Sequence, residues 1–422
     1  MGIFNQSTHD QKAYLPQPEP GLTPEEIIQR AANLRPLLLE EQAVTEERGA
    51  CSPEMHERFR RAGFYRILQP KKYGGYEFDL TVFSRVIMEI ARGCPGTAWG
   101  LSLAAGHALN VAAIFPEAAQ DLIFGEDGDF FAPMRAVPTG TATKTDDGWI
   151  IDGVWDYCSG STYSNWALVG VRIIDGSPSA QPKIGTVVIP RAQWELVDNW
   201  RGYIGMKASG SNSIRIEKAL IPKLFLVEQN LFTLDVAGGT VGYHLHGNPM
   251  YSGRLFGFFQ TEISSILVGT GFAALDEFER IVKAKSAVPG LPVIGAGTQD
   301  LVRPYGIAIG LLEGARNAVL GGAQSYLNYC AAGVKDPSLY TDLDDMRIQA
   351  GMQHAAQWAG QAIDLLFSSV GTSAAAKDST RMQRYLRDIS MARTNPGLAV
   401  ERLAVQIADR LIKERLVPEA VN

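Results

Sequence analysis

Cysteine is scarce in this sequence of 422 residues, and the four cysteines stand far apart. Cys51, Cys94, Cys158 and Cys330 form no CxxC pair, so neither a disulfide framework nor a cysteine zinc site is favoured. No run of about 18 apolar residues, the length of a membrane span, occurs in the chain. The first residues lack the basic and apolar segments of a secretory signal, so we expect a cytoplasmic protein without membrane contact.

A large excess of charge of one sign is missing as well. Lys and Arg total 39 against 45 for Asp and Glu, which gives a formal net charge of -6 without a long run of either sign. This balance argues against binding to nucleic acid or to an anionic membrane, and it favours a small or neutral partner. Hydrophobic residues are plentiful at 46% of the chain, which suits two or three domains of about 150 residues each.

The pattern of apolar residues divides the chain into segments. Residues 22–125 have helical periodicity, and Thr23 with Pro24 and two glutamates after it predicts that the first helix begins near residue 23. Residues 126–225 contain short β-rich runs, two of them joined by a predicted hairpin turn at 146–148. These runs predict a compact β domain.

The remainder of the chain is helical after a connection. Residues 226–253 contain glycines, two histidines and a proline, which is typical of a long and partly irregular connecting loop. Residues 254–422 return to apolar spacings of three and four, so long helices should pack there as a bundle.

One segment imitates a dinucleotide-binding fingerprint. Residues 269–274 read GTGFAA, which matches the GxGxxA pattern, but that fingerprint has to follow a buried strand. The ten residues before it place polar side chains at helix-compatible spacing, and no acidic residue stands about 20 positions further on. We therefore expect no nicotinamide site here, and we expect the glycines to permit close helix packing.

Three short motifs, in the right order, resemble the acyl-CoA dehydrogenase superfamily. Residues 61–75 resemble its first helical hairpin, residues 200–212 its β-domain signature, and residues 384–388 the last turn of its helical bundle. The resemblance extends over roughly residues 22–420. It implies an α+β multidomain fold with an N-terminal α-helical domain, a central β-barrel domain and a C-terminal four-helix bundle.

Two features place the resemblance in the branch of two-component flavin-dependent monooxygenases. The superfamily's dehydrogenases need a glutamate as general base, but residues 389–397 contain no carboxylate, and Glu262 lies nearly one turn beyond the alternative position at Phe259. Residues 94–99, 155–160 and 368–373 resemble segments of the monooxygenase branch. An oxygenase component of this branch takes reduced FMN or FAD, here with FMN slightly preferred, from a separate flavin reductase. It then uses O₂, through a C4a-hydroperoxyflavin, to hydroxylate an aromatic or heteroaromatic molecule.

The resemblance also implies which residues act in catalysis and hold the flavin. Ser159 is expected to contact the flavin N5, with His107 and Asn395 as the other catalytic residues. Asn395 stands where the branch commonly carries a histidine, and asparagine is no base at neutral pH. Phenol hydroxylation by another base such as His107, and N- or S-oxygenation, therefore both stay open. The residues expected to bind the flavin are Trp155, Ser159, Gly160, Ser211, Arg303, Ser369, Gly371 and Thr372.

A second group of residues is expected on the substrate side. Trp99 and His107 are eight residues apart, close to two helical turns, so both can face one side of a helix. His244 and His246 form an HxH pair with no cysteine or carboxylate beside it, and we expect a pocket rim there and no metal. The residues expected to bind substrate are Trp99, His107, His244, His246 and Arg254.

Several alternatives remain at this point. Arg384 and Arg387 could bind the flavin phosphate, or they could form an interhelical ion pair for which Asp388 is a candidate. The resemblance implies a homotetramer in which the flavin tail reaches a neighbouring subunit. An acyl-CoA dehydrogenase-like desaturase and a non-catalytic ligand-binding or scaffold protein are the alternative functions.

Overall fold

The computed structural model describes residues 15–125, 127–176, 183–286, 299–375 and 380–415. The N-terminal part is helical, as predicted. Its helices are α1 (Pro24–Arg48), α2 (Pro53–Ala62), α3 (Leu80–Gly93), α4 (Pro95–Ile114) and α5 (Glu117–Ile123). The Thr23 hydroxyl accepts a hydrogen bond from the Glu26 amide, and the Glu26 carboxylate accepts one from the Thr23 amide at 2.8 Å. This capping box confirms the predicted start of the first helix.

The central part is one sheet of seven strands in the order β5-β6-β2-β1-β3-β4-β7. The strands are β1 (Met134–Lys144), β2 (Trp149–Trp155), β3 (Trp166–Ile174), β4 (Ile184–Pro190), β5 (Glu195–Val197), β6 (Ser213–Ile221) and β7 (Leu226–Val227). Strands β1 and β2 pair antiparallel up to Lys144 and Trp149, which confirms the predicted hairpin. β1 and β3 are parallel, and the other pairs are antiparallel.

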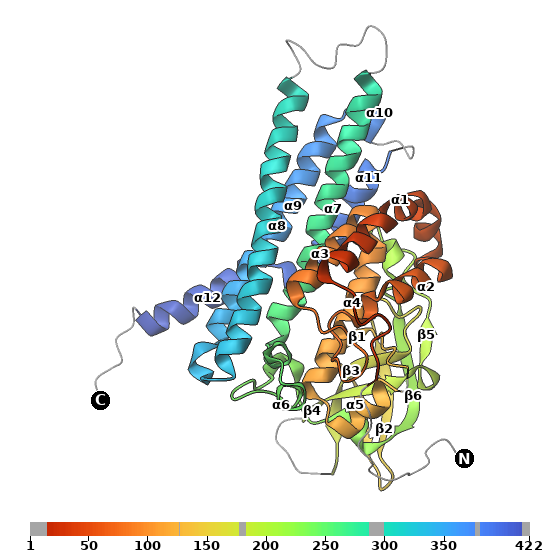
Figure 1. Cartoon of the computed structure of the whole chain (residues 1–422), viewed down its shortest axis with the longest axis vertical. Coiled ribbons are helices and arrows are strands. Elements are labelled where there is room, and N and C mark those ends of the chain that lie inside the picture. The colour runs from red at the N-terminus through yellow and green to blue at the C-terminus, as the bar shows by residue number, and fades with distance from the viewer. Residues whose placement is uncertain (1–14, 126, 177–182, 287–298, 376–379, 416–422) are drawn as a thin grey trace.

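The prediction of a central β-barrel domain is confirmed only in part, because the sheet is open. Strands β5 and β7 each have one neighbour and stand at opposite edges. With three and two residues respectively, they offer too few backbone groups to pair with each other and close the sheet. The architecture is therefore a half-barrel that leaves one side for the helices to cover (Figure 1).

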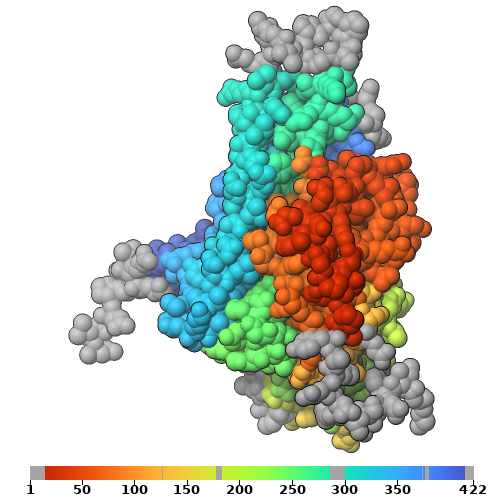
Figure 2. All heavy atoms as spheres, in the orientation of Figure 1, coloured from red at the N-terminus to blue at the C-terminus, as the bar shows by residue number. Residues whose placement is uncertain are grey.

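The C-terminal part is again helical. Its helices are α7 (Leu255–Ser286), α8 (Gln299–Gly333), α9 (Asp342–Ser369), α10 (Thr372–Ala375), α11 (Met382–Ala392) and α12 (Val400–Arg415). Helix α7 packs on α8, α9 and α11, while α12 contacts α9 and extends away from the other helices (Figures 1 and 2). Among the described residues α7 alone is long and apolar enough to cross a membrane, yet 89% of its most apolar window is buried inside the protein. That burial is typical of a core helix.

The dinucleotide-like segment lies within α7, so the expectation of helix packing is confirmed. A side chain on Gly269 would collide with the Met88 carbonyl of α3, and one on Gly271 would collide with Leu312 of α8. The two glycines therefore let α3 and α8 approach α7 closely. The residues directly before the glycines are helical and form no strand, which removes the structural basis for a nicotinamide site at this position.

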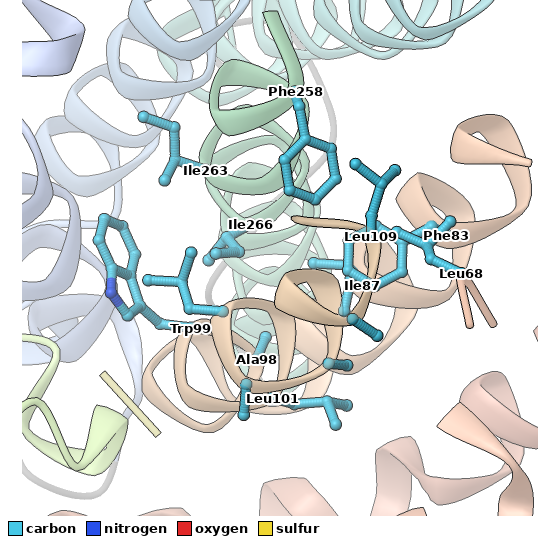
Figure 3. Packing of buried hydrophobic residues seen from close by; sticks show 14 of the residues in the cluster. Leu68, Phe83, Ile87, Ala98, Trp99, Leu101, Leu109, Phe258, Ile263 and Ile266 are labelled. Atoms are coloured by element: carbon cyan, nitrogen blue, oxygen red, sulfur yellow. The ribbon is translucent and has the colours of Figure 1, made fainter. Parts of the chain in front are cut away.

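Helices α4 and α7 pack against each other within the apolar core of the molecule. Phe258, Ile263 and Ile266 of α7 face side chains of α4 such as Leu109, and all four are almost completely buried (Figure 3). Trp99 of α4 lies at one edge of this packing (Figure 3). The core thus holds α4 firmly and leaves one side of it to line a site.

The connection between the sheet and the bundle contains short helices. Residues 231–233 and 249–252 form 3₁₀ turns, and α6 (Val241–His246) lies between them. His244 and His246 therefore stand on a helix, not on a strand as the HxH pattern would require for adjacent metal ligands on one face. The Thr240 hydroxyl caps α6 by accepting from the Tyr243 amide at 3.3 Å.

Candidate active site

A cavity of about 600 Å³ lies where α4, the sheet and the C-terminal helices meet. Its size is in the range of small-molecule and cofactor sites, roughly 300–1,000 Å³. It is lined by Trp99, Leu103, His107, Met134, Arg135, Tyr157, Ser159, Trp200, Tyr203, Met206, Ser211, Phe259, Met391, Ala392, Thr394, Asn395 and Pro396. Five of the predicted site residues, Trp99, His107, Ser159, Ser211 and Asn395, thus come together from four separate segments.

Ser159 is held in place by a chain of hydrogen bonds. The Trp99 indole Nε1 donates to the Ser159 hydroxyl at 3.0 Å, and the Ser159 and Ser211 hydroxyls share a hydrogen bond of 2.7 Å. Ser211 in turn bonds Ser209 at 2.6 Å. With Trp99 and Ser211 as donors, the Ser159 oxygen is fixed and its own hydrogen can be donated to a ligand in the cavity.

The turn that carries Ser159 depends on Gly160, whose φ is +78°. A Cβ at this position would lie 2.5 Å from the Gly100 carbonyl oxygen and 2.9 Å from the Ala104 Cβ, both on α4. Only glycine adopts this backbone conformation without strain and fits against the helix. Gly160 is among the residues predicted to bind the flavin, but the residues that crowd it belong to α4. Its contact with flavin stays a prediction.

His107 faces the cavity as a neutral hydrogen-bond acceptor. Its Nδ1 lies 2.7 Å from the Ala132 carbonyl oxygen, which fixes the hydrogen on Nδ1 and leaves Nε2 as an acceptor. Burial lowers the pKa of His107 to about 4, so the ring is uncharged at neutral pH. The ring is therefore suited to accept a hydrogen bond from a substrate hydroxyl, and it is only a weak base.

Asn395 lines the cavity, as its predicted place beside the flavin requires. Its Oδ1 accepts a hydrogen bond from the Gly397 amide at 2.9 Å and so caps the short 3₁₀ turn Pro396–Leu398. No acceptor for the Asn395 amide nitrogen is found within the described ranges. The side chain can therefore donate into the cavity while its oxygen holds the backbone.

Replacing Asn395 tests whether a base belongs at this position. Asn395→Ala should lose a cap of about 1 kcal/mol and one hydrogen bond, whereas Asn395→His should introduce a group that titrates near pH 6.5. The measurement is the rate of product formation as a function of pH. As a control, Asn328→His on the exposed face of α8 should leave the profile unchanged. Profiles of both Asn395 variants that overlay the wild type would place Asn395 away from the reaction.

Aromatic rings form part of the cavity wall. The rings of Trp200 and Tyr203 stack with centroids 4.1 Å apart, and the Tyr157 ring meets Trp200 edge-on at 6.2 Å. Tyr157 and Met206 both have positive φ values, 62° and 52°. Such backbone strain in non-glycine residues is concentrated at functional sites. Tyr157, Trp200 and Met206 lie inside the motifs that carry the resemblance, so the sequence held a signal for them that we did not use.

No Asp or Glu belongs to the described lining of the cavity. Glu262 on α7 is fully buried, and neither carboxyl oxygen has a partner among the described residues. Burial raises the pKa of Glu262 well above its ordinary value, which favours the protonated carboxyl. A protonated carboxyl outside the cavity cannot serve as the general base of a desaturase.

The arginines of α11 hold helices together. Arg384 and Arg387 both pair with Glu46 of α1, so the ion-pair alternative is confirmed with Glu46, not Asp388, as the partner. Asp388 is buried, and its carboxyl oxygen accepts the Met206 amide at 2.6 Å, while burial raises its pKa to about 7. These contacts attach the cavity wall at Met206 to α1 and α11.

Four of the residues predicted to bind flavin lie away from the cavity, on the C-terminal helices. Arg303 is exposed on α8, Gly371 and Thr372 are exposed near the start of α10, and the Ser369 hydroxyl donates to the Leu365 carbonyl at 2.7 Å. Trp155 is also outside the lining, because it is fully buried and its indole donates to the Gly170 carbonyl at 2.9 Å. Their contacts with flavin stay predictions.

Three residues predicted to bind substrate also lie outside the cavity lining. His244 is exposed on α6, and His246 shares a hydrogen bond of 2.9 Å with Gln120. Arg254 forms an ion pair with Asp342, which neutralises its charge, and it donates a hydrogen bond to the Tyr340 carbonyl. His246 and Arg254 thus have structural partners away from the cavity, and the role of all three residues in substrate binding stays a prediction.

Family models match both helical ends of the chain. The model of the acyl-CoA dehydrogenase N-terminal domain matches residues 30–121, and that of the acyl-CoA dehydrogenase C-terminal domain matches residues 263–397. The sheet with its Ser159 site lies between the two matched segments. The chain belongs to the acyl-CoA dehydrogenase superfamily.

Within this superfamily, the curated relatives that match over most of their length are hydroxylases. The chain is 28% identical over 382 residues to a pigment production hydroxylase of Rhodococcus sp., covering 90% of this chain and 94% of that protein. It is 26% identical to the flavin-dependent monooxygenase oxygenase subunit HsaA of Rhodococcus jostii, covering 90% and 96%. Over nine-tenths of its length the chain is thus similar to a protein named as the oxygenase subunit of a flavin-dependent monooxygenase.

Solved structures share the whole fold. The crystal structure of 3-HSA hydroxylase from Rhodococcus sp. RHA1 has a TM-score of 0.82 and 25% identity, covering 94% of this chain and 98% of that chain. XiaF from Streptomyces sp., solved with FADH2 and glycerol, has a TM-score of 0.80 at 20% identity, covering 94% and 97%. The superfamily's fold therefore extends over the sheet as well as the helical ends.

Proposed function

We propose that this chain is the oxygenase component of a two-component flavin-dependent monooxygenase that hydroxylates an aromatic small molecule. The observation that carries the proposal is the Ser159 hydroxyl, held by Trp99 and Ser211 at the wall of an aromatic cavity. The described lining provides no carboxylate for the proton abstraction that a desaturase needs. The relatives matched over nine-tenths of the chain are hydroxylases, which supports the same reaction.

The residues present fit a reduced flavin. The cavity is large, mainly apolar, and offers the hydroxyls of Ser159 and Ser211 for the polar edge of an isoalloxazine ring. Reduced flavin, when bound, supplies the electrons that activate O₂. We propose reduced FMN or FAD as the cofactor, with FMN slightly preferred. Flavin is present in solved proteins of this fold as FADH2 in XiaF and as FMN in TdsC from Paenibacillus sp. A11-2.

The chain's own residues position the substrate and exclude water. His107 Nε2 accepts the hydrogen of a substrate hydroxyl, since Nδ1 is held by the Ala132 carbonyl. The Asn395 amide nitrogen donates to the ligand, and the rings of Trp99 and Phe259 cover its faces. Because this apolar wall keeps water away, the hydrogen bond from Ser159 is stronger than it would be in solvent.

Dependence on a separate reductase tests this function directly. NADH alone should give no hydroxylation, because the dinucleotide-like segment lies within helix α7. Chemically reduced FMN or FAD should support hydroxylation in the presence of O₂. The measurement compares NADH consumption and product formation with and without an added flavin reductase. Rapid NADH oxidation by the chain alone would contradict the two-component assignment.

Assembly and location are part of the proposal. A homotetramer would cover apolar side chains that stand exposed on the C-terminal helices, among them Val302 and Ile307 of α8 and Val405 and Ile412 of α12. The oligomeric mass from light scattering tests this. We also propose a cytoplasmic location, where a flavin reductase partner could reach the chain.

A further inference from the structure

We propose that Arg135 selects an aromatic substrate that carries an anionic group such as a carboxylate. This inference names the substrate class and so rests on the proposed function. Arg135 stands near the start of β1, is half-buried and lines the cavity. No motif in the sequence pointed to it.

The Arg135 guanidinium has no ionic partner in the described parts of the chain. It forms no ion pair or side-chain hydrogen bond there, and it lies over the face of the Tyr157 ring, 5.8 Å from the centroid. By contrast, Arg92, which is also half-buried, binds the Asp276 carboxylate. A half-buried cation without a carboxylate is suited to bind an anion supplied by a ligand.

The rest of the described lining leaves this positive charge uncompensated. It contains aromatic rings, thioethers, hydroxyls, an amide and the neutral His107, but no Asp or Glu. Asp156, which precedes Tyr157 in the sequence, does not line the cavity, and its carboxylate accepts a hydrogen bond from Ser213 at 2.5 Å. A ligand with one negative charge would therefore compensate the positive charge of Arg135 in the cavity.

The aromatic walls define the other half of the ligand. Four aromatic side chains line the same cavity as Arg135, namely Tyr157, Trp200, Tyr203 and Phe259. Ring surfaces favour a planar aromatic body, and a guanidinium favours a carboxylate that it can bind with two parallel hydrogen bonds. Together they describe an aromatic acid.

Calorimetric titration of the flavin-free protein tests this without any turnover. The probes are two matched pairs, phenylacetate with phenylacetamide and indole-3-acetate with indole-3-acetamide. The wild type should bind each carboxylate about 10- to 100-fold more tightly than its amide, as expected for a hydrogen-bonded charge pair. Arg135→Gln should abolish this preference, and Arg135→Lys should retain part of it.

A control arginine distinguishes a charge that lines the cavity from a charge elsewhere on the sheet. Arg172 on β3 is exposed and donates to the Pro138 and Thr139 carbonyls, so Arg172→Gln should keep the full preference for carboxylates. Equal affinity for acid and amide in both pairs, or binding of neither, would overturn the proposal. Because the titration contains no flavin, this result would leave the monooxygenase assignment to its own test.

A second source of negative charge is the reduced flavin itself, and a separate measurement distinguishes it. Anaerobic titration with reduced FMN should give the same affinity, within about twofold, for the wild type and Arg135→Gln. If the substitution instead weakens reduced FMN about tenfold or more and leaves the carboxylate preference intact, the anion is the flavin. That result would overturn the assignment of Arg135 to substrate selection.

Discussion

Replacing Ser159 by alanine should increase the rate of hydrogen peroxide release about 10- to 100-fold at similar substrate affinity. The expected size follows from the loss of a hydrogen bond in a dry site, about 1.4–2.7 kcal/mol, which corresponds to that range in rate. The side chain is 5% exposed and its oxygen is fixed by Trp99 and Ser211, so alanine removes a donor that no water replaces easily.

The measurement follows hydrogen peroxide and hydroxylated product for each reduced flavin consumed. Peroxide should rise at the expense of product, while binding of the substrate stays similar. A matched control is Ser161→Ala, because the Ser161 hydroxyl is equally buried but donates to the Gly210 carbonyl at 3.0 Å and does not line the cavity. This variant should release no more peroxide than the wild type.

The hydrogen-bond chain gives the experiment a second arm. Ser211→Ala removes the hydroxyl that shares a 2.7 Å hydrogen bond with Ser159 but leaves the donor from Trp99 in place. We expect an intermediate increase in peroxide release, because Ser159 is still present but less well oriented. Unchanged peroxide release in Ser159→Ala would assign Ser159 to the structure of the turn and remove it from the flavin site.

Local signals in the sequence predicted individual helices and strands. They did not predict whether the sheet closes, because closure depends on strands that are far apart in the sequence. The cap at Thr23 and the hairpin turn before Trp149 are encoded within a few residues, and both are confirmed. Whether the sheet closes depends on whether its two edge strands reach each other. Strands β5 and β7 are too short for that, and their lengths depend on tertiary pairing.

The candidate site shows the same division between local and long-range information. Trp99 and His107 were predicted from helical spacing, and Ser159 and Asn395 from short motifs; the cavity contains all four. Arg135 was missed because a single arginine near the start of a strand has no spacing or motif that marks it. Its significance depends on the absence of a carboxylate from segments far away in the sequence, which only the assembled cavity displays.

Glu262→Gln should stabilise the folded protein relative to the wild type, and the gain should grow as pH rises. The wild-type carboxyl is fully buried on α7, has no hydrogen-bond partner among the described residues, and has a pKa raised well above its ordinary value by burial. Glutamine has similar volume and no proton to lose. Near the ordinary pKa of glutamate the two proteins should differ least.

The sign follows from where the proton is held in each state. In the unfolded chain the Glu262 carboxyl has its ordinary pKa and loses its proton once the pH exceeds that value. In the folded chain the pKa is raised, so the carboxyl stays protonated to higher pH. Rising pH therefore stabilises the unfolded state of the wild type. As a result the free energy of unfolding of the wild-type protein falls by up to about 1.4 kcal/mol per pH unit relative to the glutamine variant. The difference should stop growing once pH exceeds the raised pKa of the buried carboxyl.

Urea unfolding of both proteins between about pH 5 and about pH 8 measures this difference, since the slope of stability with pH counts the protons bound. The matched control is Glu40→Gln, which makes the same substitution at an exposed glutamate on α1. Parallel stability curves for the wild type and Glu262→Gln would mean that the folded chain holds Glu262 ionised. An ionised carboxylate one turn from Phe259 would return a general base to the neighbourhood of the cavity, and the desaturase alternative with it. A widening difference leaves the site without a base at this position, as the oxygenase assignment requires.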